Sequence, residues 1–209
     1  MDLSIAVPKG RLFEDTVNLF LKAGIIEEPL KEDSRKLIIE ESKSGIKFFL
    51  VRAKDVITYV SEGIADLGVV GYDLLVEENP DVFHLLDLGF GYCKMVVAGK
   101  EGVNLNSISI KVVTKFPNIA RSYFRLKEVE PEIIELYGSV ELGPLVGLSD
   151  CIVDITSTGK TLEENNLVVL DEIIEITSRL VSNKKSLYFK KSEISEIVEK
   201  ISSSLNNSL

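Results

Sequence analysis

The chain has 209 residues, of which 45% are hydrophobic and 27% are charged, as expected for a globular protein of one domain or two small ones. Its formal net charge of −9 argues against nonspecific binding to nucleic acid, which needs a basic surface. No apolar run reaches the roughly 18 residues of a membrane-spanning helix, and no signal peptide is evident, so we expect a cytoplasmic protein without membrane contact.

The first half of the chain alternates apolar runs typical of strands with amphipathic runs typical of helices. Strands are predicted at 3–7, 36–40, 46–51, 66–70 and 82–86, and helices at 12–22, 53–61 and 71–78. Such alternation favours an α/β fold with a mainly parallel sheet covered by helices on both faces. The glycines at 89 and 91 are predicted to mark the first crossing to a second lobe.

The second half continues in the same way. Strands are predicted at 92–98, 111–114, 132–136, 151–155 and 168–181, and helices at 117–129, 141–148 and 192–205. The run at 168–181 is interpreted as one long return strand, and the last helix as packing on the first lobe. The predicted lobes are therefore 1–90 with 179–209, and 91–178.

Cysteine and histidine are scarce, which narrows the chemistry. Cys93 and Cys151 lie in apolar runs and are interpreted as reduced core residues. His84 is the only histidine and is expected to be a half-buried strand residue. The sequence therefore disfavours a structural zinc site and Ser-His-Asp or Cys-His catalysis, and we predict no metal ligands among the protein side chains.

The central motif is a short apolar run followed by a loop rich in hydroxyl groups. Cys151–Ile155 is predicted to be a buried parallel strand, and a helix is expected to follow with Thr158 or Thr161 as its N-cap. The free backbone N–H groups of a helix start favour an anion, and neighbouring hydroxyls add donors. The loop residues predicted to bind a phosphate are Thr156, Ser157, Thr158, Gly159, Lys160 and Thr161.

Asp154 at the end of this strand distinguishes the motif from a Walker P-loop, of which only Gly159, Lys160 and Thr161 fit. A carboxylate in this position can accept hydrogen bonds from two vicinal hydroxyls, as on a ribose. The motif therefore predicts a sugar-phosphate site, with the phosphate on the loop and the hydroxyls on Asp154. An ordinary strand-to-helix turn rich in capping residues is the alternative.

Basic residues stand beside several predicted strands. Lys9, Gly10 and Arg11 follow the first strand and form a second potential anion site, the alternative being a solvated loop. Arg35 precedes the strand at 36–40, and Arg52 ends the one at 46–51. An arginine at a strand end can point into a ligand crevice, so both arginines are candidate site residues.

Several short motifs are spread along the chain. They are Pro8–Leu12, Arg52–Val56 with Tyr59 and Val60, Gly63–Asp73, Thr114–Asn118, Gly138–Glu141 and Val153–Leu162. In the same order, these motifs resemble those of the ATP phosphoribosyltransferases, the first enzymes of histidine biosynthesis. The resemblance covers nearly the whole chain, and the length is that of the short form, which lacks a C-terminal regulatory domain. Phe116 stands where tyrosine is common, and Leu142 with Gly143 replaces a more usual small residue; neither change removes a charge.

The resemblance implies two lobes like those of a type II periplasmic binding protein, with the active site in the interlobe cleft. It implies transfer of a phosphoribosyl group from phosphoribosyl pyrophosphate to N1 of the adenine of ATP, with release of pyrophosphate. Mg²⁺ is expected on the pyrophosphate oxygens, held largely by substrate and water.

The resemblance also implies a partner. Short-form enzymes use a regulatory subunit that resembles histidyl-tRNA synthetase, so we expect a homodimer of this chain within a hetero-octamer. Because the sequence stops at Leu209, directly after the last predicted helix, we expect histidine to inhibit through that subunit. An unregulated homodimer is the alternative.

Site roles follow from the same resemblance. Asp154 is expected to hold the ribose hydroxyls, and the loop from Thr156 to Thr161 the 5-phosphate. Arg35 and Arg52 are the expected catalytic residues, acting on the leaving pyrophosphate. The residues expected to bind ATP are Lys9, Arg11, Asp73, Thr114 and Glu141, of which the last three are equally open to a role as helix cap or structural ion pair.

Two rival functions stay open. A two-lobe solute-binding protein would bind an anion without catalysis, but the absence of an export signal and the sugar-phosphate loop count against it. A base-salvage phosphoribosyltransferase usually carries two adjacent acidic residues in this motif, whereas Ile155 follows Asp154 here.

Overall fold

The structure is a computed structural model that describes residues 2–32 and 36–206. The chain divides into two compact units, one formed by Met1–Leu75, Asn79–Gly91 and Thr177–Leu209, the other by Val76–Glu78 and Tyr92–Ile176. The two main crossings between the units lie at 91/92 and 176/177. In the described part of the chain, no helix is both long and apolar enough to span a bilayer.

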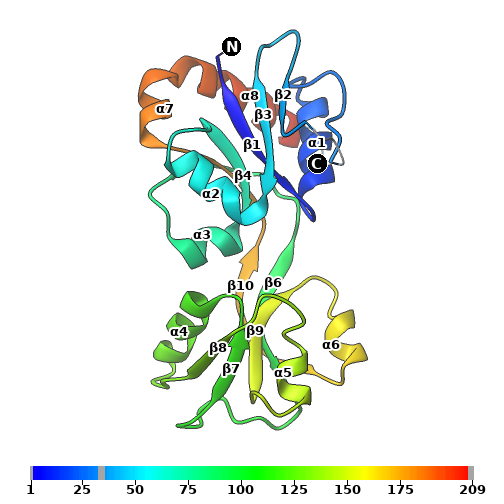
Figure 1. The fold of residues 1–209 in the computed structure, drawn as a ribbon, viewed down its shortest axis with the longest axis vertical. Helices are drawn as coiled ribbons and strands as arrows, with labels where there is room; N and C mark the ends of the chain where they lie inside the picture. Colours follow the sequence, from blue (N-terminus) through cyan, green and yellow to red (C-terminus); the bar gives the residue numbers. More distant parts are fainter. Residues whose placement is uncertain (1, 33–35, 207–209) are drawn as a thin grey trace. The chain divides into compact units, whose positions relative to one another are not determined.

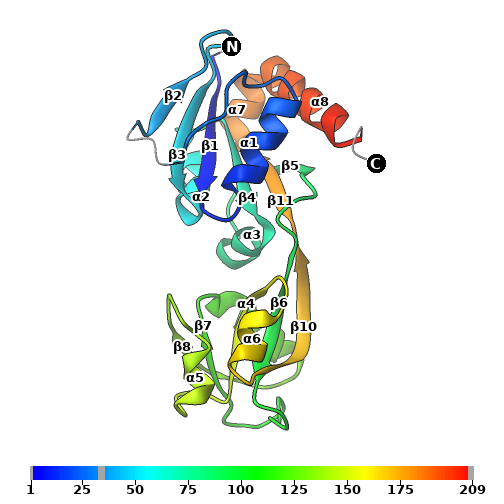
Figure 2. The same cartoon turned by 90° about the vertical axis from the view of Figure 1, so that its right-hand side faces the viewer.

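The first unit is built on a six-stranded sheet with the order β2-β3-β1-β4-β11-β5 (Figures 1 and 2). Its strands are β1 Ser4–Lys9, β2 Ile38–Glu40, β3 Lys47–Arg52, β4 Leu67–Gly71, β5 Phe83–Asp87 and β11 Ser178–Ser182. Its helices are α1 Phe13–Lys22, α2 Ala53–Ser61, α3 Tyr72–Glu78, α7 Lys184–Phe189 and α8 Lys191–Asn206, the last residues of α3 being grouped with the second unit.

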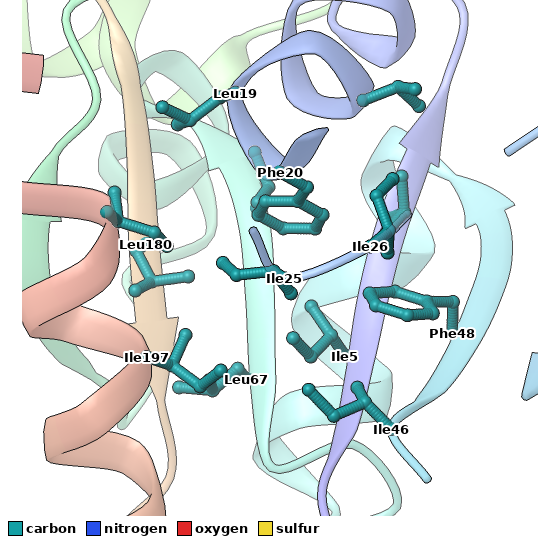
Figure 3. Close-up of a cluster of buried hydrophobic side chains, with 14 of the residues drawn as sticks. Ile5, Leu19, Phe20, Ile25, Ile26, Ile46, Phe48, Leu67, Leu180 and Ile197 are labelled. Carbon is teal, nitrogen blue, oxygen red and sulfur yellow. The ribbon is translucent and has the colours of Figure 1, made fainter. Parts of the chain in front are cut away.

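Alternating side chains of β1 serve two separate hydrophobic cores. Ile5 lies in the core covered by α1 and α8, which lie side by side (Figures 1 and 2), whereas Ala6 lies in the core covered by α2. Figure 3 shows Phe20 of α1 and Phe48 of β3 within the larger core, with their ring centroids 5.9 Å apart. Ile197 of α8 is fully buried in the same core, so the last helix packs on the first lobe as the sequence predicts.

The second unit contains a five-stranded sheet with the order β10-β6-β9-β7-β8. Its strands are β6 Cys93–Gly99, β7 Lys111–Thr114, β8 Glu132–Glu135, β9 Cys151–Thr156 and β10 Val168–Ile176, and its helices are α4 Pro117–Leu126, α5 Leu142–Leu145 and α6 Lys160–Glu164. Strand β9 lies in the interior of this sheet, between β6 and β7. Its residue Cys151 is buried, as is Cys93 of β6, and neither forms a disulfide.

The α/β class is confirmed, but the prediction of mainly parallel sheets is wrong, because both sheets are mixed. In the first sheet β1 runs parallel to β3 and β4, and the other described pairings are antiparallel. In the second sheet β7 runs parallel to β8 and β9, whereas β6 pairs antiparallel with β9 and β10. Alternation of strands and helices along a sequence does not specify which strands become neighbours or in which direction they pair.

Several predicted boundaries are also corrected. The return strand is two strands, β10 and β11, in different sheets, and helix α7 between β11 and α8 was not predicted. Helix α4 ends at Leu126 rather than near 129, because Glu128 has a φ of +60°. His84 is exposed on β5 rather than half-buried, with its ring edge-on to Tyr72.

Candidate functional site

A pocket of about 180 Å³ lies within the second unit, where β9 ends and α6 begins. Ile152, Asp154 and Thr156 alternate along β9 and all line it, so they share one face of the strand. Ser157 to Leu162 line it from the loop and the start of α6, and Val96, Glu141 and Ile155 complete the wall. The structure therefore brings together the whole predicted sugar-phosphate motif.

Asp154 is the acidic group at the end of the buried strand. Its side chain is 17% exposed, and Oδ1 accepts a hydrogen bond from its neighbour's backbone N–H, that of Ile155, at 2.8 Å. Lys115 places Nζ 3.2 Å from the same oxygen. Burial is the largest influence and raises the pKa of Asp154, and Glu141 acts in the same direction, whereas Lys115 and the Ile155 N–H oppose the shift. The carboxylate is thus half-buried, and Lys115 and the Ile155 N–H stabilise its charged form.

The loop after Asp154 is folded by its own hydroxyl groups. The N–H of Gly159 donates to Oγ1 of Thr156 at 3.1 Å, and the N–H of Lys160 to Oγ1 of Thr158 at 3.5 Å. Gly159 has a φ of +77°, which favours glycine, and it is the N-cap of α6 in place of the predicted Thr158 or Thr161. Ser157, Thr158 and Thr161 are exposed, so their hydroxyls face solvent or a ligand.

Lys115 is a site residue that the sequence predictions missed. Thr114 is fully buried, donates from Oγ1 to the carbonyl of Val153 at 2.6 Å, and accepts from the N–H of Phe116 at 2.8 Å. Thr114 and Val153 are register partners on parallel strands, so the residues that follow them, Lys115 and Asp154, come side by side. Lys115 lies in the motif Thr114–Asn118, but its position beside Asp154 could be recognised only once the register of β7 against β9 was known.

Thr114 and Glu141 are related to the pocket in different ways. The hydroxyl of Thr114 is used inside the unit, so this residue shapes the site through the backbone on either side of it. Glu141 is half-buried directly before α5 and contributes to the pocket wall. Glu141 and Asp154 therefore lie near the same space, and both are acidic.

The first unit carries its own group of cations, at the carboxyl ends of its parallel strands. Lys9 and Arg52 end β1 and β3, and they are register partners. Arg52 ends its strand, as the sequence predicts, and it is exposed and forms the N-cap of α2. The sheet thus sets two positive charges on neighbouring strands, which is an arrangement suited to an anion.

The remaining candidates have mixed outcomes. Arg11 donates from Nη1 to the carbonyl of Gly91 at 2.6 Å, within the first unit. Asp73 is buried in the first turn of α3, and its Oδ1 lies so close to Gly71 that a Cβ there would be 2.2 Å away. Arg35 lies outside the described residues.

Comparison with known proteins points to one family. The family model described as ATP phosphoribosyltransferase matches residues 52–203. An ATP phosphoribosyltransferase from Caldanaerobacter subterraneus subsp. tengcongensis is 53% identical over 208 residues, which is 99% of each chain. One from Aquifex aeolicus is 50% identical over 202 residues, covering 95% of this chain and 93% of the relative.

Solved structures agree with this and with the fold. The structure titled ATP phosphoribosyl transferase (HisG:HisZ) complex from Thermotoga maritima contains a chain that matches with a TM-score of 0.85 and 38% identity, covering 98% of this chain and 99% of that one. The periplasmic aliphatic sulphonate binding protein SsuA from Escherichia coli matches with a TM-score of 0.62 and 13% identity, covering 97% of this chain and 72% of that one. The second match shows only a shared fold, that of a periplasmic binding protein.

Proposed function

Because the chain belongs to the ATP phosphoribosyltransferase family, we propose that it catalyses the first step of histidine biosynthesis, transferring the phosphoribosyl group of phosphoribosyl pyrophosphate to N1 of the adenine of ATP. The observation that carries the proposal is the pocket of the second unit, where the carboxylate of Asp154 shares one cavity with a loop of hydroxyl and N–H donors. A ribose 5-phosphate needs both kinds of group at once.

The substrate binds in this pocket through two contacts of different chemistry. Asp154 accepts hydrogen bonds from the ribose hydroxyls, and the loop from Thr156 to Thr161 surrounds the 5-phosphate. Lys160 adds a positive charge to the pocket wall. The pocket holds two carboxylates, on Asp154 and Glu141, and Asp154 is already paired with a lysine, which fits Mg²⁺ arriving on the substrate's pyrophosphate oxygens rather than in a cage of side chains. Bound there, the ion would neutralise negative charge on the leaving pyrophosphate.

The chemical step is displacement at the anomeric carbon, with positive charge developing on the sugar and negative charge on the pyrophosphate. The protein orients the reactants and stabilises those charges, so no covalent nucleophile is required. Arg52 and Arg35 act on the pyrophosphate, and Lys9 and Arg11 on the phosphates of ATP. Lys9 and Arg52 are register partners at the ends of β1 and β3, so the sheet places two positive charges side by side. This arrangement supports phosphate binding by both residues.

Assembly and location complete the proposal. The Thermotoga maritima match comes from a structure titled as a complex, so this chain is proposed to bind a regulatory subunit of the same kind, resembling histidyl-tRNA synthetase, as a homodimer within a hetero-octamer. Its two buried cysteines are not joined in a disulfide, which fits a reducing compartment, and we propose that the reaction takes place in the cytoplasm.

The test is pyrophosphate release from radiolabelled phosphoribosyl pyrophosphate, with ATP and free purine bases as alternative acceptors, with and without the regulatory subunit. We expect turnover when ATP is the acceptor and none when a free purine base is the acceptor. Asp154→Asn should abolish most of it, while Asp171→Asn, which removes a carboxylate paired with Lys127 in the same unit, should not. Turnover with a free base would point to a salvage enzyme, and tight binding without turnover in any mixture to a solute-binding protein.

A further inference from the structure

Lys115 forms the only described ion pair that ends inside the substrate pocket. Its Nζ is 3.2 Å from Oδ1 of Asp154, and its side chain is 35% exposed. Two other charged groups line the same pocket: Glu141, directly before α5, and Lys160, at the start of α6. Of these groups, Lys115 contacts the carboxylate directly, whereas Glu141 opposes its ionisation.

The position of Lys115 is fixed by its neighbours on both sides. Thr114 is bonded to Val153, directly before Asp154, and to the N–H of Phe116, directly after Lys115. A threonine hydroxyl that accepts from the backbone N–H two residues later, as Thr114 does from Phe116, holds the chain in a tight local turn. The ammonium group also lies 5.1 Å from the centroid of the Phe116 ring, within range of a cation–π contact. Lys115 is therefore held toward the pocket and is not a freely moving surface lysine.

The pair has a consequence for substrate binding. Ribose hydroxyls are donors, and they need an ionised carboxylate as acceptor. Burial and the nearby Glu141 raise the pKa of Asp154. Once protonated, the carboxyl would present a donor where the ribose hydroxyls need an acceptor. The adjacent ammonium group of Lys115 opposes protonation of Asp154.

We propose that Lys115 is a positioning residue of the phosphoribosyl pyrophosphate site, which orients Asp154 and keeps it as the carboxylate that receives the ribose hydroxyls. The inference rests on the proposed function, since it assumes that Asp154 meets the ribose. It adds to that function a residue that contacts Asp154 rather than the substrate, and it assigns the motif around Thr114 to the same role.

The chain offers a closely matched control in Lys127. Its Nζ is 2.9 Å from Oδ2 of Asp171 and 5.0 Å from the centroid of the Tyr123 ring, and its side chain is 34% exposed. It thus has the same two kinds of partner and the same exposure as Lys115, within the same unit, but neither it nor Asp171 lines the pocket. The variant Lys127→Met therefore shows how much substrate affinity is lost when a lysine–aspartate pair away from the pocket is removed.

The experiment measures the affinity for phosphoribosyl pyrophosphate by calorimetry between pH 5 and pH 8.5, for the wild type, Lys115→Met, Lys115→Arg and Lys127→Met. Affinity that depends on the Asp154 carboxylate is present above its pKa and is lost as the pH falls through it. Removal of Lys115 raises that pKa, so the loss should begin about 1–3 pH units higher in Lys115→Met, with binding about tenfold weaker or worse in the acid range. Protonation of the substrate's own phosphate affects every variant alike.

Lys115→Arg should restore the wild-type profile, and Lys127→Met should share it. A Lys115→Met protein whose affinity is unchanged, or is reduced by the same factor at every pH, would overturn the proposal. The carboxyl ¹³C titration of Asp154 in the free chain separates this from failure of the proposed function. A higher midpoint in Lys115→Met without any change in substrate affinity would mean that the pair exists but that Asp154 does not hold the ribose.

Discussion

At the scale of single residues, Asp154 is the group that distinguishes this pocket from a general phosphate site. It stands at the end of a buried strand, and the hydroxyl-rich loop begins two residues later. Hydroxyl-rich loops suit many phosphorylated ligands, whereas a half-buried carboxylate beside the same loop requires donors on the ligand. This one residue therefore carries the prediction that the ligand is a sugar phosphate.

We predict that Asp154→Ala weakens the binding of phosphoribosyl pyrophosphate more than the binding of ATP. The ribose hydroxyls lose a charged acceptor, which costs about 1.5–3 kcal/mol. Separate calorimetric titrations of the two ligands check this, with Asp171→Ala as the control. Equal losses for both ligands would remove the assignment of Asp154 to the ribose.

We predict that Arg52→Ala slows the chemical step more than it weakens ground-state binding of ATP. Arg52 is an exposed cation at the end of β3, beside Lys9, and the negative charge on pyrophosphate grows as the bond to the sugar breaks. Loss of one such stabilising group costs about 10²–10³-fold in rate. Single-turnover kinetics measure it, with the exposed Arg121→Ala as the control. A normal chemical rate with weaker ATP binding would assign Arg52 to the nucleotide.

At the scale of elements, the segment that leaves the first unit after β5 contains two glycines with different requirements. Gly89 and Gly91 have φ of +71° and +68°, so any other residue is strained at either position. An added Cβ at Gly91 would lie 2.3 Å from Cδ2 of Leu12, whereas one at Gly89 would meet nothing within 4 Å. The carbonyl of Gly91 also accepts from Arg11.

We therefore predict that Gly91→Ala destabilises the first unit more than Gly89→Ala does. Both variants carry the cost of the left-handed backbone, about 1–2 kcal/mol, and Gly91→Ala adds an overpacking cost of about 1–3 kcal/mol. Urea denaturation of the two variants side by side isolates the second cost. Equal midpoints would mean that Leu12 moves aside freely.

Helix α8 gives a second prediction at this scale. Ile197 is fully buried in the core beneath the helix, whereas Glu199 is exposed on the same helix. Ile197→Ala should lower the free energy of unfolding by about 2–5 kcal/mol, and Glu199→Ala should change it by less than about 0.5 kcal/mol. Thermal and urea unfolding provide the measurement. A similar small effect for both would show that α8 is not part of the cooperative core.

At the scale of the whole molecule, the feedback inhibition by histidine that we expect requires an effector site. An effector needs a site whose affinity differs between two states, and the described residues fall into two units that the catalytic motifs already occupy. The match from Thermotoga maritima, which covers 98% of this chain, comes from a structure titled as a HisG:HisZ complex.

We predict that histidine inhibits this chain only when the regulatory subunit is present. The measurement is the initial rate of pyrophosphate release against histidine concentration, for the chain alone and then after the subunit is added. The chain alone should show no saturable inhibition. Saturable inhibition of the isolated chain, not relieved by either substrate, would place the effector site on this chain.

What the sequence determined by itself was local. Helix α2 occupies the predicted residues 53–61, strand β7 the predicted 111–114, and the motif from Asp154 to Thr161 lines one pocket, because each depends on side-chain periodicity or on contacts within a few residues. The family was also evident, because its motifs are short and occur in a fixed order.

Only the tertiary structure decided the features that depend on residues far apart in the chain. Strand direction, and the division of 168–181 between two sheets, follow from which strands become neighbours. The pair of Lys115 with Asp154 follows from the register of β7 against β9, 39 residues apart at Thr114 and Val153. A sequence pattern records which face a residue prefers, whereas register is set by the packing of whole strands, so the partner of the most informative carboxylate became visible only in three dimensions.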